Sequence, residues 1–292
     1  MADVNPRLLR RMLLLRQFPM FATAELSELA TIAENLVETE FAPGAVIAPA
    51  GARLPGLHLV LDGEIQAGRS WGPREIFGEL EAFAGRGHAA RAVAATGTRT
   101  LLLSASDLAE IVEDNFGVLI ALVRDLAARL LATRPRTRVI ALPRGGPGLG
   151  LVERLIALRQ LAPFVGARLQ GLAMLAHSSE EVSWAPGATV ARAGELASGS
   201  ALVLDGMLAV QPPGGATSEL APGQAFGGLE TLAGVGHGAT LVAVEPVRAL
   251  YSSATAMFDV LEDHPDIAMS MIGVFAQGLL DGAPLAPLAP AN

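Results

Sequence analysis

The residues whose types and spacing suit chemistry lie in a phrase that the chain carries twice. Residues 77–91 read FGELEAFAGRGHAAR, and residues 226–240 read FGGLETLAGVGHGAT. Glycine lets a backbone approach a bound group closely, and free N–H groups at a helix start attract an anion. Both copies contain Gly-x-Gly-His. This motif either marks a ligand common to the two copies or descends from one parent sequence, which is the simpler interpretation.

Catalysis and metal binding find no support in the sequence. The chain has no cysteine and no lysine, so all 21 basic residues are arginine and thiolate, Schiff-base and P-loop lysine chemistry are excluded. No G-x-S-x-G nucleophile elbow occurs. The five histidines include no i, i+4 pair, which argues against a metal site. They are His58, His88, His177, His237 and His264. We therefore expect a protein that is not an enzyme and holds no metal.

Charge is distributed unevenly along the chain. Residues 144–292 hold 6 Arg against 13 Asp and Glu, a balance of −7 that repels a phosphate backbone. The sequence has one basic cluster, which could bind nucleic acid or an acidic partner. We favour a simpler interpretation, in which the arginines solubilise the C-terminal end of a helix and interact favourably with its dipole. The cluster comprises Arg124, Arg129, Arg134, Arg136, Arg138 and Arg144. The glycine-rich 145–150 fits neither nucleotide fingerprint and is typical of a flexible linker.

The rest of the chain repeats together with the phrase. At an offset of 143 residues, FAPG at 41–44 aligns with WAPG at 184–187, and LVLDG at 59–63 aligns with LVLDG at 202–206. From the phrase onward the offset is 149, because QPPGGATS at 211–218 contains a six-residue insertion. A single length change in a Pro/Gly-rich turn is what a duplicated domain tolerates most easily. We conclude that the chain is a tandem duplication.

Each unit has the same pattern of elements. A helix with an apolar face comes first, short apolar runs broken by turn residues follow, and a long helix closes the unit. In the first unit the apolar face of the leading helix comprises Leu26, Leu29, Ile32 and Ala33. For 292 residues this predicts two domains, 1–138 and 151–283, with a linker at 139–150 and a Pro/Ala tail at 284–292. The fold class is mainly β with flanking helices (α+β), as two tandem jelly-roll β-barrels.

In this order of elements the chain resembles the cyclic-nucleotide-binding domain family, the sensor fold of catabolite activator protein and of the protein kinase A regulatory subunit. The resemblance rests on the leading helix FPMFATAELSELATIAE, the strands FAPGAVIAPAGA, the hairpin LHLVLDGEIQA and the phrase FGELEAFAGRGHAARAVA. It implies an eight-stranded jelly roll whose last helix moves on ligand binding. It also implies that the phrase is a phosphate-binding cassette, F-G-E-[LI]-A-L-L-x-x-x-P-R-A-A-[ST]-V. We call 77–91 the first cassette and 226–240 the second.

In the family, the cassette Glu bonds the ribose 2′-hydroxyl and the cassette Arg bonds the cyclic phosphate. By this resemblance the candidate ligand-binding residues of the first cassette are Gly78, Glu79, Leu80, Arg86 and His88. The corresponding degenerate pocket in the second cassette comprises Gly227, Gly228, Leu229 and His237. His88 and His237 replace the Arg, Gly87 replaces the Pro before it, and Gly228 replaces the Glu.

The lost Arg decides the functional expectation. A charge-assisted hydrogen bond to phosphate is worth about 1.5–3 kcal/mol, so its loss weakens binding by roughly ten- to a hundredfold. The second cassette lacks both anchors, and we expect no family-type binding there. In the first, Arg86 could reach over the cassette, whereas Arg91 points to the face opposite His88. A protonated His88 could also meet a phosphate, although its reference pKa of about 6.5 leaves it mostly neutral.

Two functions from different classes follow. We favour a regulatory adaptor with no cofactor, whose two degenerate folds make protein–protein contacts with an unidentified partner. The alternative is a receptor in which domain 1 binds cyclic AMP, cyclic GMP or another phosphorylated signal and domain 2 relays or dimerises. An apolar stripe at the family's dimerisation position suits packing on its own barrel or a homodimer seam. The stripe comprises Leu119, Leu122, Val123, Leu126 and Leu130.

Two further expectations concern what the chain lacks. After the last helix, which should end near Leu280, we see no room for the DNA-binding helix-turn-helix of the family's transcription factors. No stretch of about 18 apolar residues suggests a membrane span, and the N-terminus is too rich in arginine for a secretory signal. We therefore expect a cytoplasmic protein.

Overall fold

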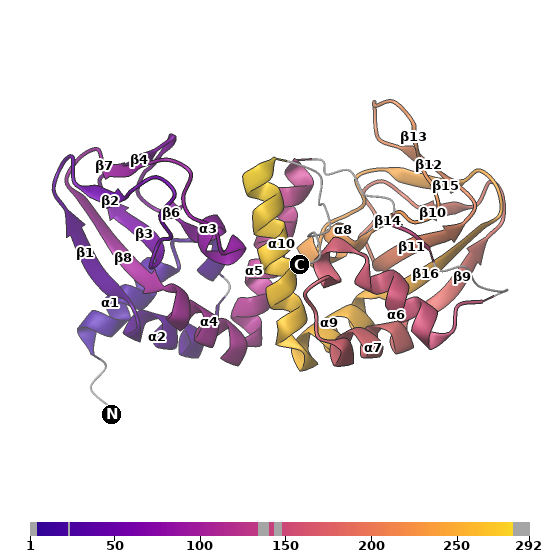
Figure 1. The fold of residues 1–292 in the computed structure, drawn as a ribbon, viewed down its shortest axis with the longest axis horizontal. Coiled ribbons are helices and arrows are strands. Elements are labelled where there is room, and N and C mark those ends of the chain that lie inside the picture. The colour runs from indigo at the N-terminus through magenta and orange to yellow at the C-terminus, as the bar shows by residue number, and fades with distance from the viewer. Residues whose placement is uncertain (1–4, 23, 134–139, 143–147, 283–292) are drawn as a thin grey trace. The chain divides into compact units, whose positions relative to one another are not determined.

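The computed structural model describes residues 5–22, 24–133, 140–142 and 148–282 (Figure 1). The chain separates into two compact units, Met1–Asp125 and Leu126–Asn292. The predicted tail and half of the predicted linker lie outside the described residues, as do four arginines of the basic cluster, Arg134, Arg136, Arg138 and Arg144. The domain boundaries at 138 and 151 stay predictions.

The first unit begins with two helices, continues through strands and ends in helix. Its strands are β1 (Val37–Phe41), β2 (Val46–Ala48), β3 (Gly56–Asp62), β4 (Ile65–Ala67), β5 (Arg69–Trp71), β6 (Ile76–Phe77), β7 (Ala92–Ala94) and β8 (Thr98–Ser104). Its helices are α1 (Pro6–Leu15), the short 3-10 turn η1 (Pro19–Phe21), α2 (Leu26–Glu34), α3 (Glu79–Ala84) and α4 (Ala105–Asp114). Helix α5 (Phe116–Ala132) crosses the boundary between the units.

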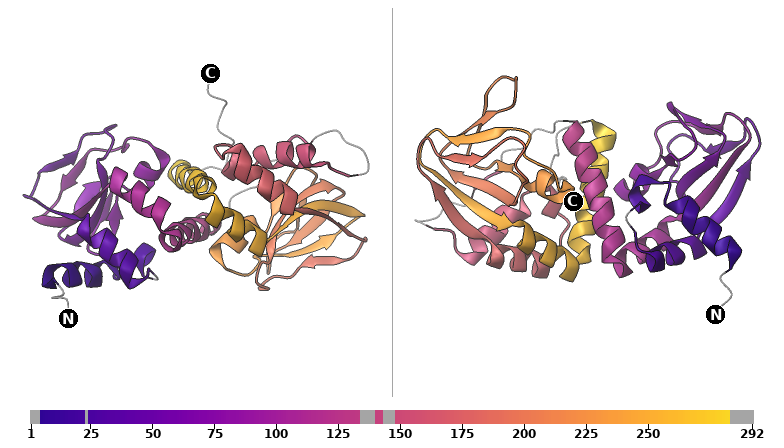
Figure 2. Two further views of the ribbon diagram at one scale, coloured as in Figure 1. Left: turned by 90° about the horizontal axis from the view of Figure 1, so that it is seen from below. Right: turned by 180° about the vertical axis from the view of Figure 1, so that it is seen from behind.

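The strands of this unit form two antiparallel four-stranded sheets, in the orders β1-β8-β3-β6 and β2-β7-β4-β5. A core of buried residues draws on both sheets, so the sheets pack face to face, as the views in Figures 1 and 2 also show. The core comprises Ala48, Leu54, Val60, Ile65, Ala67, Phe77 and Ala92. The predicted jelly roll is confirmed, although its two sheets do not close into one barrel, and helices hold more of the described residues than strands.

The second unit repeats this topology. Its strands are β9 (Glu180–Trp184), β10 (Thr189–Ala191), β11 (Gly199–Asp205), β12 (Leu208–Gln211), β13 (Ser218–Leu220), β14 (Ala225–Phe226), β15 (Thr240–Ala243) and β16 (Val247–Ser253), in sheets β14-β11-β16-β9 and β10-β15-β12-β13. Its helices are α6 (Leu151–Arg159), the 3-10 turn η2 (Ala162–Phe164), α7 (Leu169–Ser178), α8 (Gly228–Ala233), α9 (Ala254–Asp263) and α10 (Pro265–Asp281). The predicted insertion lies in the β12–β13 turn.

Glycines with positive φ confirm the duplication at single-residue resolution. Five pairs recur at the offsets read from the sequence. They are Gly44 and Gly187, Gly51 and Gly194, Gly63 and Gly206, Gly78 and Gly227, and Gly85 and Gly234. Because L side chains disfavour this region, each pair fixes the same turn in both units. The two units therefore share turns as well as strands.

Arg74 is the exception among the described residues, since it has a φ of 71° without being glycine. Its counterpart is Gly223, with a φ of 85°. The N–H of each donates to a valine carbonyl, Arg74 to Val60 at 2.9 Å and Gly223 to Val203 at 2.8 Å. The turn is thus retained at the cost of a left-handed arginine, a conformation that is unfavourable by roughly 1–2 kcal/mol.

Arg74→Gly is expected to raise the free energy of unfolding of the first unit by about 0.5–1 kcal/mol. The relieved strain exceeds the extra chain entropy of glycine, which costs roughly 0.5–1 kcal/mol. Urea unfolding measures the change. Arg53→Gly is the matched control, because Arg53 lies at an ordinary φ and its replacement should destabilise. Equal effects of the two substitutions would contradict the strain at Arg74.

The helices differ from expectation at one point and leave another open. In α2, Leu29, Ile32 and Ala33 are buried as their spacing predicts, but Leu26 at the first position is exposed. The five residues of the α5 stripe are buried, and dimerisation through them stays a prediction. Within the described residues, no helix combines the length and apolar character that crossing a bilayer needs.

Candidate functional site: the two glycine–histidine cassettes

The first cassette is a tight turn that leads from β6 into α3. Gly78 caps α3 with a left-handed φ of 86°, and a Cβ there would lie 2.2 Å from Leu54 Cδ1. Gly85 ends α3 with a φ of 63°. Two glycines therefore give this six-residue helix its abrupt start and stop, because other residues would be strained at both ends.

The backbone of His88 is fixed by the loop after β2. Its N–H donates to Ala52 O at 2.9 Å, and its carbonyl accepts from Gly51 N at 2.7 Å. Gly87 is needed beside it, because a Cβ on Gly87 would lie 2.1 Å from Gly51 O. Glycine thus stands where the family has proline because two backbone segments approach each other closely.

The side chain of His88 points into the protein. It is 4% exposed, and its ring centroid lies 4.9 Å from that of Phe77 and 5.9 Å from that of Trp71. Its Nε2 lies 3.3 Å from Glu81 Oε1, and its Nδ1 contacts the backbone of Ala90 at 2.9 Å from O and 3.3 Å from N. Both ring nitrogens are therefore occupied by groups of the protein.

The other predicted residues of this cassette lie at its surface. Glu79 and Leu80 are half-buried in the first turn of α3, and Arg86 is exposed after it. Glu79 and Arg86 each have an interaction partner in the structure. Arg91 is exposed, just before β7. The structure therefore brings Gly78, Glu79 and Leu80 to one turn, whereas His88 is turned inward behind them.

A second buried histidine packs behind the cassette. The ring centroid of His58, on β3, lies 6.2 Å from that of Phe77, and its Nδ1 lies 3.0 Å from Thr100 Oγ1. Burial lowers the pKa of His58 from 6.5 to about 4, because the charged imidazolium would lose its hydration. His58 is therefore neutral at neutral pH and belongs to the core.

The second cassette keeps the backbone of the first. Gly227 caps α8 with a φ of 79°, and Gly234 ends it with a φ of 68°. The backbone N–H of His237 donates to Glu195 O, and the backbone carbonyl of His237 accepts from Gly194 N, both at 2.9 Å. Its side chain is half-buried, and a Cβ on Gly227 would lie 3.5 Å from His237 Cε1. A Cβ on Gly228 would lie 3.0 Å from Ser200 Oγ, at the place where the family has its Glu.

Sequence reasoning missed Glu81, the carboxylate that holds His88. The signal was available, because a Glu stands seven residues before the His in both copies, as Glu81 and Glu230. In the cassette pattern that position is Ala, so the change from Ala to Glu accompanies the change from Arg to His. Trp71 was also missed, and only the fold brings it to His88.

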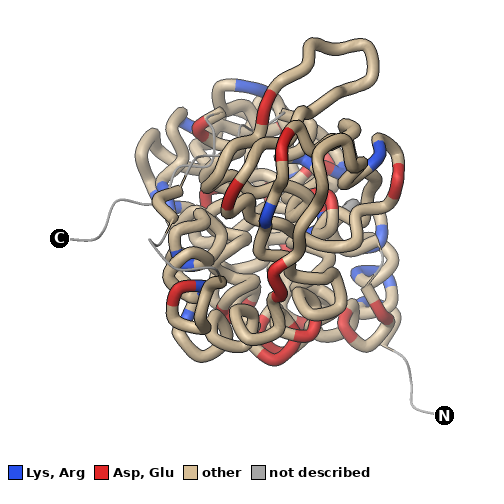
Figure 3. Tube along the Cα trace, turned by 90° about the vertical axis from the view of Figure 1, so that its right-hand side faces the viewer, with Lys and Arg blue, Asp and Glu red and all other residues tan. Residues whose placement is uncertain are grey.

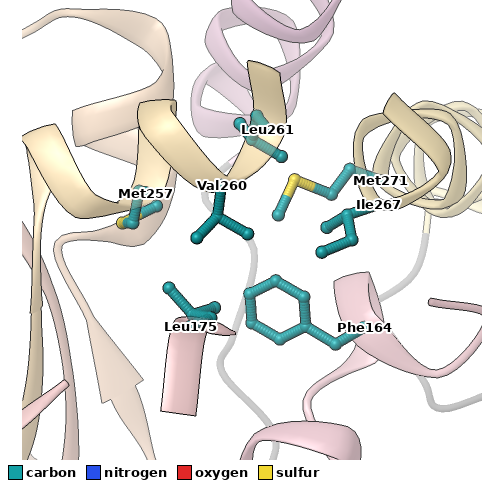
Figure 4. Close-up of a pocket in the computed structure, with 7 residues that line it drawn as sticks. All are labelled: Phe164, Leu175, Met257, Val260, Leu261, Ile267 and Met271. Carbon is teal, nitrogen blue, oxygen red and sulfur yellow. The ribbon is translucent and has the colours of Figure 1, made fainter. Parts of the chain in front are cut away.

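One hollow is an apolar recess in the second unit (Figure 4). Side chains from η2, α7, α9 and α10 point toward one another across it. They are Phe164, Leu175, Met257, Val260, Leu261, Ile267 and Met271. The room for the centre of a water-sized sphere is about 10 Å³, so at most about one water fits. The recess is part of the core packing. No group of three or more metal-ligating side chains occurs among the described residues.

Comparison with known proteins agrees with this architecture. A model of the family described as cyclic nucleotide-binding domain matches residues 38–115 and 181–264, which together make up more than half of the chain. Each match covers one jelly roll with its cassette and extends to the helix that follows the last strand. No curated protein matches the chain.

Solved structures are similar at low identity. The regulatory domain of Toxoplasma gondii PKA with cAMP is 16% identical, with 94% of this chain and 98% of that chain covered and a TM-score of 0.36. A regulatory subunit of a cAMP-independent protein kinase A from Trypanosoma cruzi, bound to guanosine, is 16% identical, with 99% and 98% covered and a TM-score of 0.36. The N-terminal domain of a transcriptional regulator from Streptomyces coelicolor is 22% identical, with 43% and 90% covered and a TM-score of 0.39.

Proposed function

Because the chain belongs to the cyclic nucleotide-binding domain family, with the domain present twice in tandem, we propose that it is a non-enzymatic regulatory adaptor. It does not bind cyclic AMP or cyclic GMP in the family manner. Its two domains act as surfaces for protein–protein contact.

The observation that carries the proposal is the position of the His88 side chain. An anion needs a donor that faces the ligand, but this ring faces Phe77 and Trp71 and has a group of the protein beside each of its nitrogens. Turning it outward would expose the aromatic contacts and leave the carboxylate of Glu81, whose side chain is 12% exposed, without the imidazole nitrogen beside it. A mostly buried polar group that loses its partner raises the free energy of the fold, so the inward position of the ring is favoured.

Electrostatics supports the same conclusion. The first cassette carries an additional carboxylate, Glu81, where the family's pattern has Ala, and a cyclic phosphate brings a further negative charge. Like charges at close range repel, and partial burial strengthens the repulsion because less water screens it. The second cassette has lost both the Glu and the Arg, so neither the ribose nor the phosphate has its side-chain partner there.

Calorimetry of the full chain with cyclic AMP, cyclic GMP and cyclic di-GMP tests the proposal. We expect no binding heat from any of the three at ligand concentrations up to about 1 mM. A dissociation constant of about 1 mM corresponds to a binding free energy of only roughly −4 kcal/mol. Glu79→Ala should behave like the unaltered protein. Micromolar binding that Glu79→Ala abolishes would overturn the adaptor proposal.

That result would favour the alternative, a receptor in which domain 1 binds a cyclic nucleotide and domain 2 relays or dimerises. One observation favours this second candidate. Glu79 lies half-buried in the first turn of α3, directly after the left-handed Gly78, which is the position of the family's ribose-binding carboxylate.

A further inference from the structure

The first helix of the first unit is apolar on two sides. Its inner side buries Leu15 completely. On its outer side Leu9 is 46% exposed and Leu13 is 60% exposed. A surface helix that packs on one core normally presents polar residues on the side away from that core. The packing of α1 on its own unit therefore does not account for its outer leucines.

The same outer residues recur in the second unit. At the offset of 143, Leu9 corresponds to Val152 and Leu13 to Ile156, which are 66% and 47% exposed on α6. The inner residue corresponds too, since Leu158 is buried as Leu15 is. Positions beside these two differ between the helices. For example, Arg10 of α1 corresponds to Glu153 of α6. Two exposed apolar positions have thus been kept while a charge beside them reversed.

An exposed arginine completes each outer face. Arg16 follows Leu13 by three residues, and Arg159 follows Ile156 by three. At 100° per residue the three positions fall within about 60° of arc, so they form one line along the helix. We define stripe A as Leu9, Leu13 and Arg16, and stripe B as Val152, Ile156 and Arg159.

Charge identifies what fits the stripes. Helix α1 contains no Asp or Glu, and its Arg7 and Arg10 are exposed as well. Helix α6 has one carboxylate, Glu153, against Arg154 and Arg159, so charge favours an acidic partner more strongly at stripe A than at stripe B. The stripe residue shared by both helices is a cation placed one turn after two apolar side chains. A helix with apolar residues at i and i+4 and a carboxylate one turn further on complements this line, since Arg bonds carboxylates strongly.

We propose that stripes A and B are two equivalent docking sites for an acidic amphipathic helix of a partner protein. The inference rests on the adaptor function and names the chemistry of the partner. Each chain binds the same kind of helix twice, once on each unit. Binding buries the exposed apolar pair of each stripe and pairs its arginine with a carboxylate.

A synthetic peptide of about 15 residues, with Leu along one face and Glu elsewhere, is the probe. Titration into the full chain, followed by calorimetry, should give two peptides per chain. Leu13→Gln should remove one site and Ile156→Gln the other, each lowering the stoichiometry from two to one. The double variant should lose at least tenfold in affinity. Val46→Gln, at an exposed apolar residue outside the stripes, should leave both sites intact.

A scrambled peptide of the same composition should not bind. The proposal is overturned if the first peptide fails to bind, if the scrambled peptide binds equally, or if the stoichiometry ignores Leu13 and Ile156. It is also overturned if the two substitutions abolish binding to phosphatidylserine vesicles or self-association in sedimentation instead. Far-ultraviolet circular dichroism checks that each variant is folded. Nucleotide binding would overturn the adaptor proposal without affecting the peptide stoichiometry.

Discussion

His88→Arg is expected to create cyclic AMP binding in a chain for which we propose none. The substitution restores the guanidinium of the family's pattern, which Gly78 and Glu79 already match. Because arginine is longer than histidine, its guanidinium can reach past the place that the ring occupies beside Phe77 and Trp71. A charge-assisted hydrogen bond of about 1.5–3 kcal/mol corresponds to a gain of ten- to a hundredfold, which calorimetry would measure.

The duplication supplies a matched control. His237→Arg makes the same change in the second unit, where Gly228 stands in place of the carboxylate. We expect no binding there, because a phosphate contact without the ribose contact leaves the ligand half-anchored. Adding Glu79→Ala to His88→Arg should remove the gained affinity. Equal gains at both histidines, or a gain that survives Glu79→Ala, would contradict the assignment of the cassette residues.

Acid is expected to destabilise the first unit by about 3 kcal/mol through His58 alone. The pKa of this buried imidazole is lowered from 6.5 to about 4. Below pH 6.5 the unfolded chain therefore takes up a proton that the folded unit refuses. The contribution of His58 to stability is complete above pH 6.5 and is lost as the pH falls toward 4, at about 1.36 kcal/mol per unit.

His58→Gln should remove this part of the pH dependence, because glutamine does not titrate. The measurement is urea unfolding at pH 7 and pH 4, followed by Trp71 emission in a Trp184→Phe background. The difference in unfolding free energy between the two pH values should be smaller by about 3 kcal/mol in the variant. His177→Gln is the control, since His177 is exposed on α7. A pH dependence that both variants share with the parent protein would refute the role of His58.

Much of the fold could be read from the sequence because duplication states each element twice. Two copies of each turn glycine fix the hairpins, and the shift of offset from 143 to 149 locates the insertion between β12 and β13. Apolar spacing predicted the buried face of α2 but not the exposure of Leu26, because spacing does not reveal where a helix extends past its core.

The chemistry of the cassette was harder to predict. The loss of the Arg is visible in the sequence, but the inward direction of His88 is not. That direction depends on Trp71 and on Glu81, which only the fold places around the ring. The sequence gives no reason to single out His58 among the five histidines, and its neutrality follows from burial on β3. A sequence motif does not show which residues distant in the sequence will bury a side chain, so the burial of His58 and His88 could not be predicted from it.

The exposed apolar residues of stripe B could not be recognised from the sequence. Figure 3 shows acidic and basic residues interspersed with uncharged segments along the trace. Val152 and Ile156 stand beside Glu153 and Arg154, and only their burial shows that they face outward.

We call the first cassette closed because the side chain of His88 points into the protein and offers no donor to a ligand. This claim can be tested directly with the two tryptophans of the chain. Trp71 packs against His88 at 5.9 Å between ring centroids, and Trp184 lies on β9 of the second unit, so their indole N–H signals in a ¹⁵N spectrum report on different domains. Addition of about 1 mM cyclic AMP, roughly the limit of useful affinity, is predicted to move neither signal. A saturable shift of the Trp71 signal alone would mean that the first cassette opens for the nucleotide, which contradicts a cassette closed by His88.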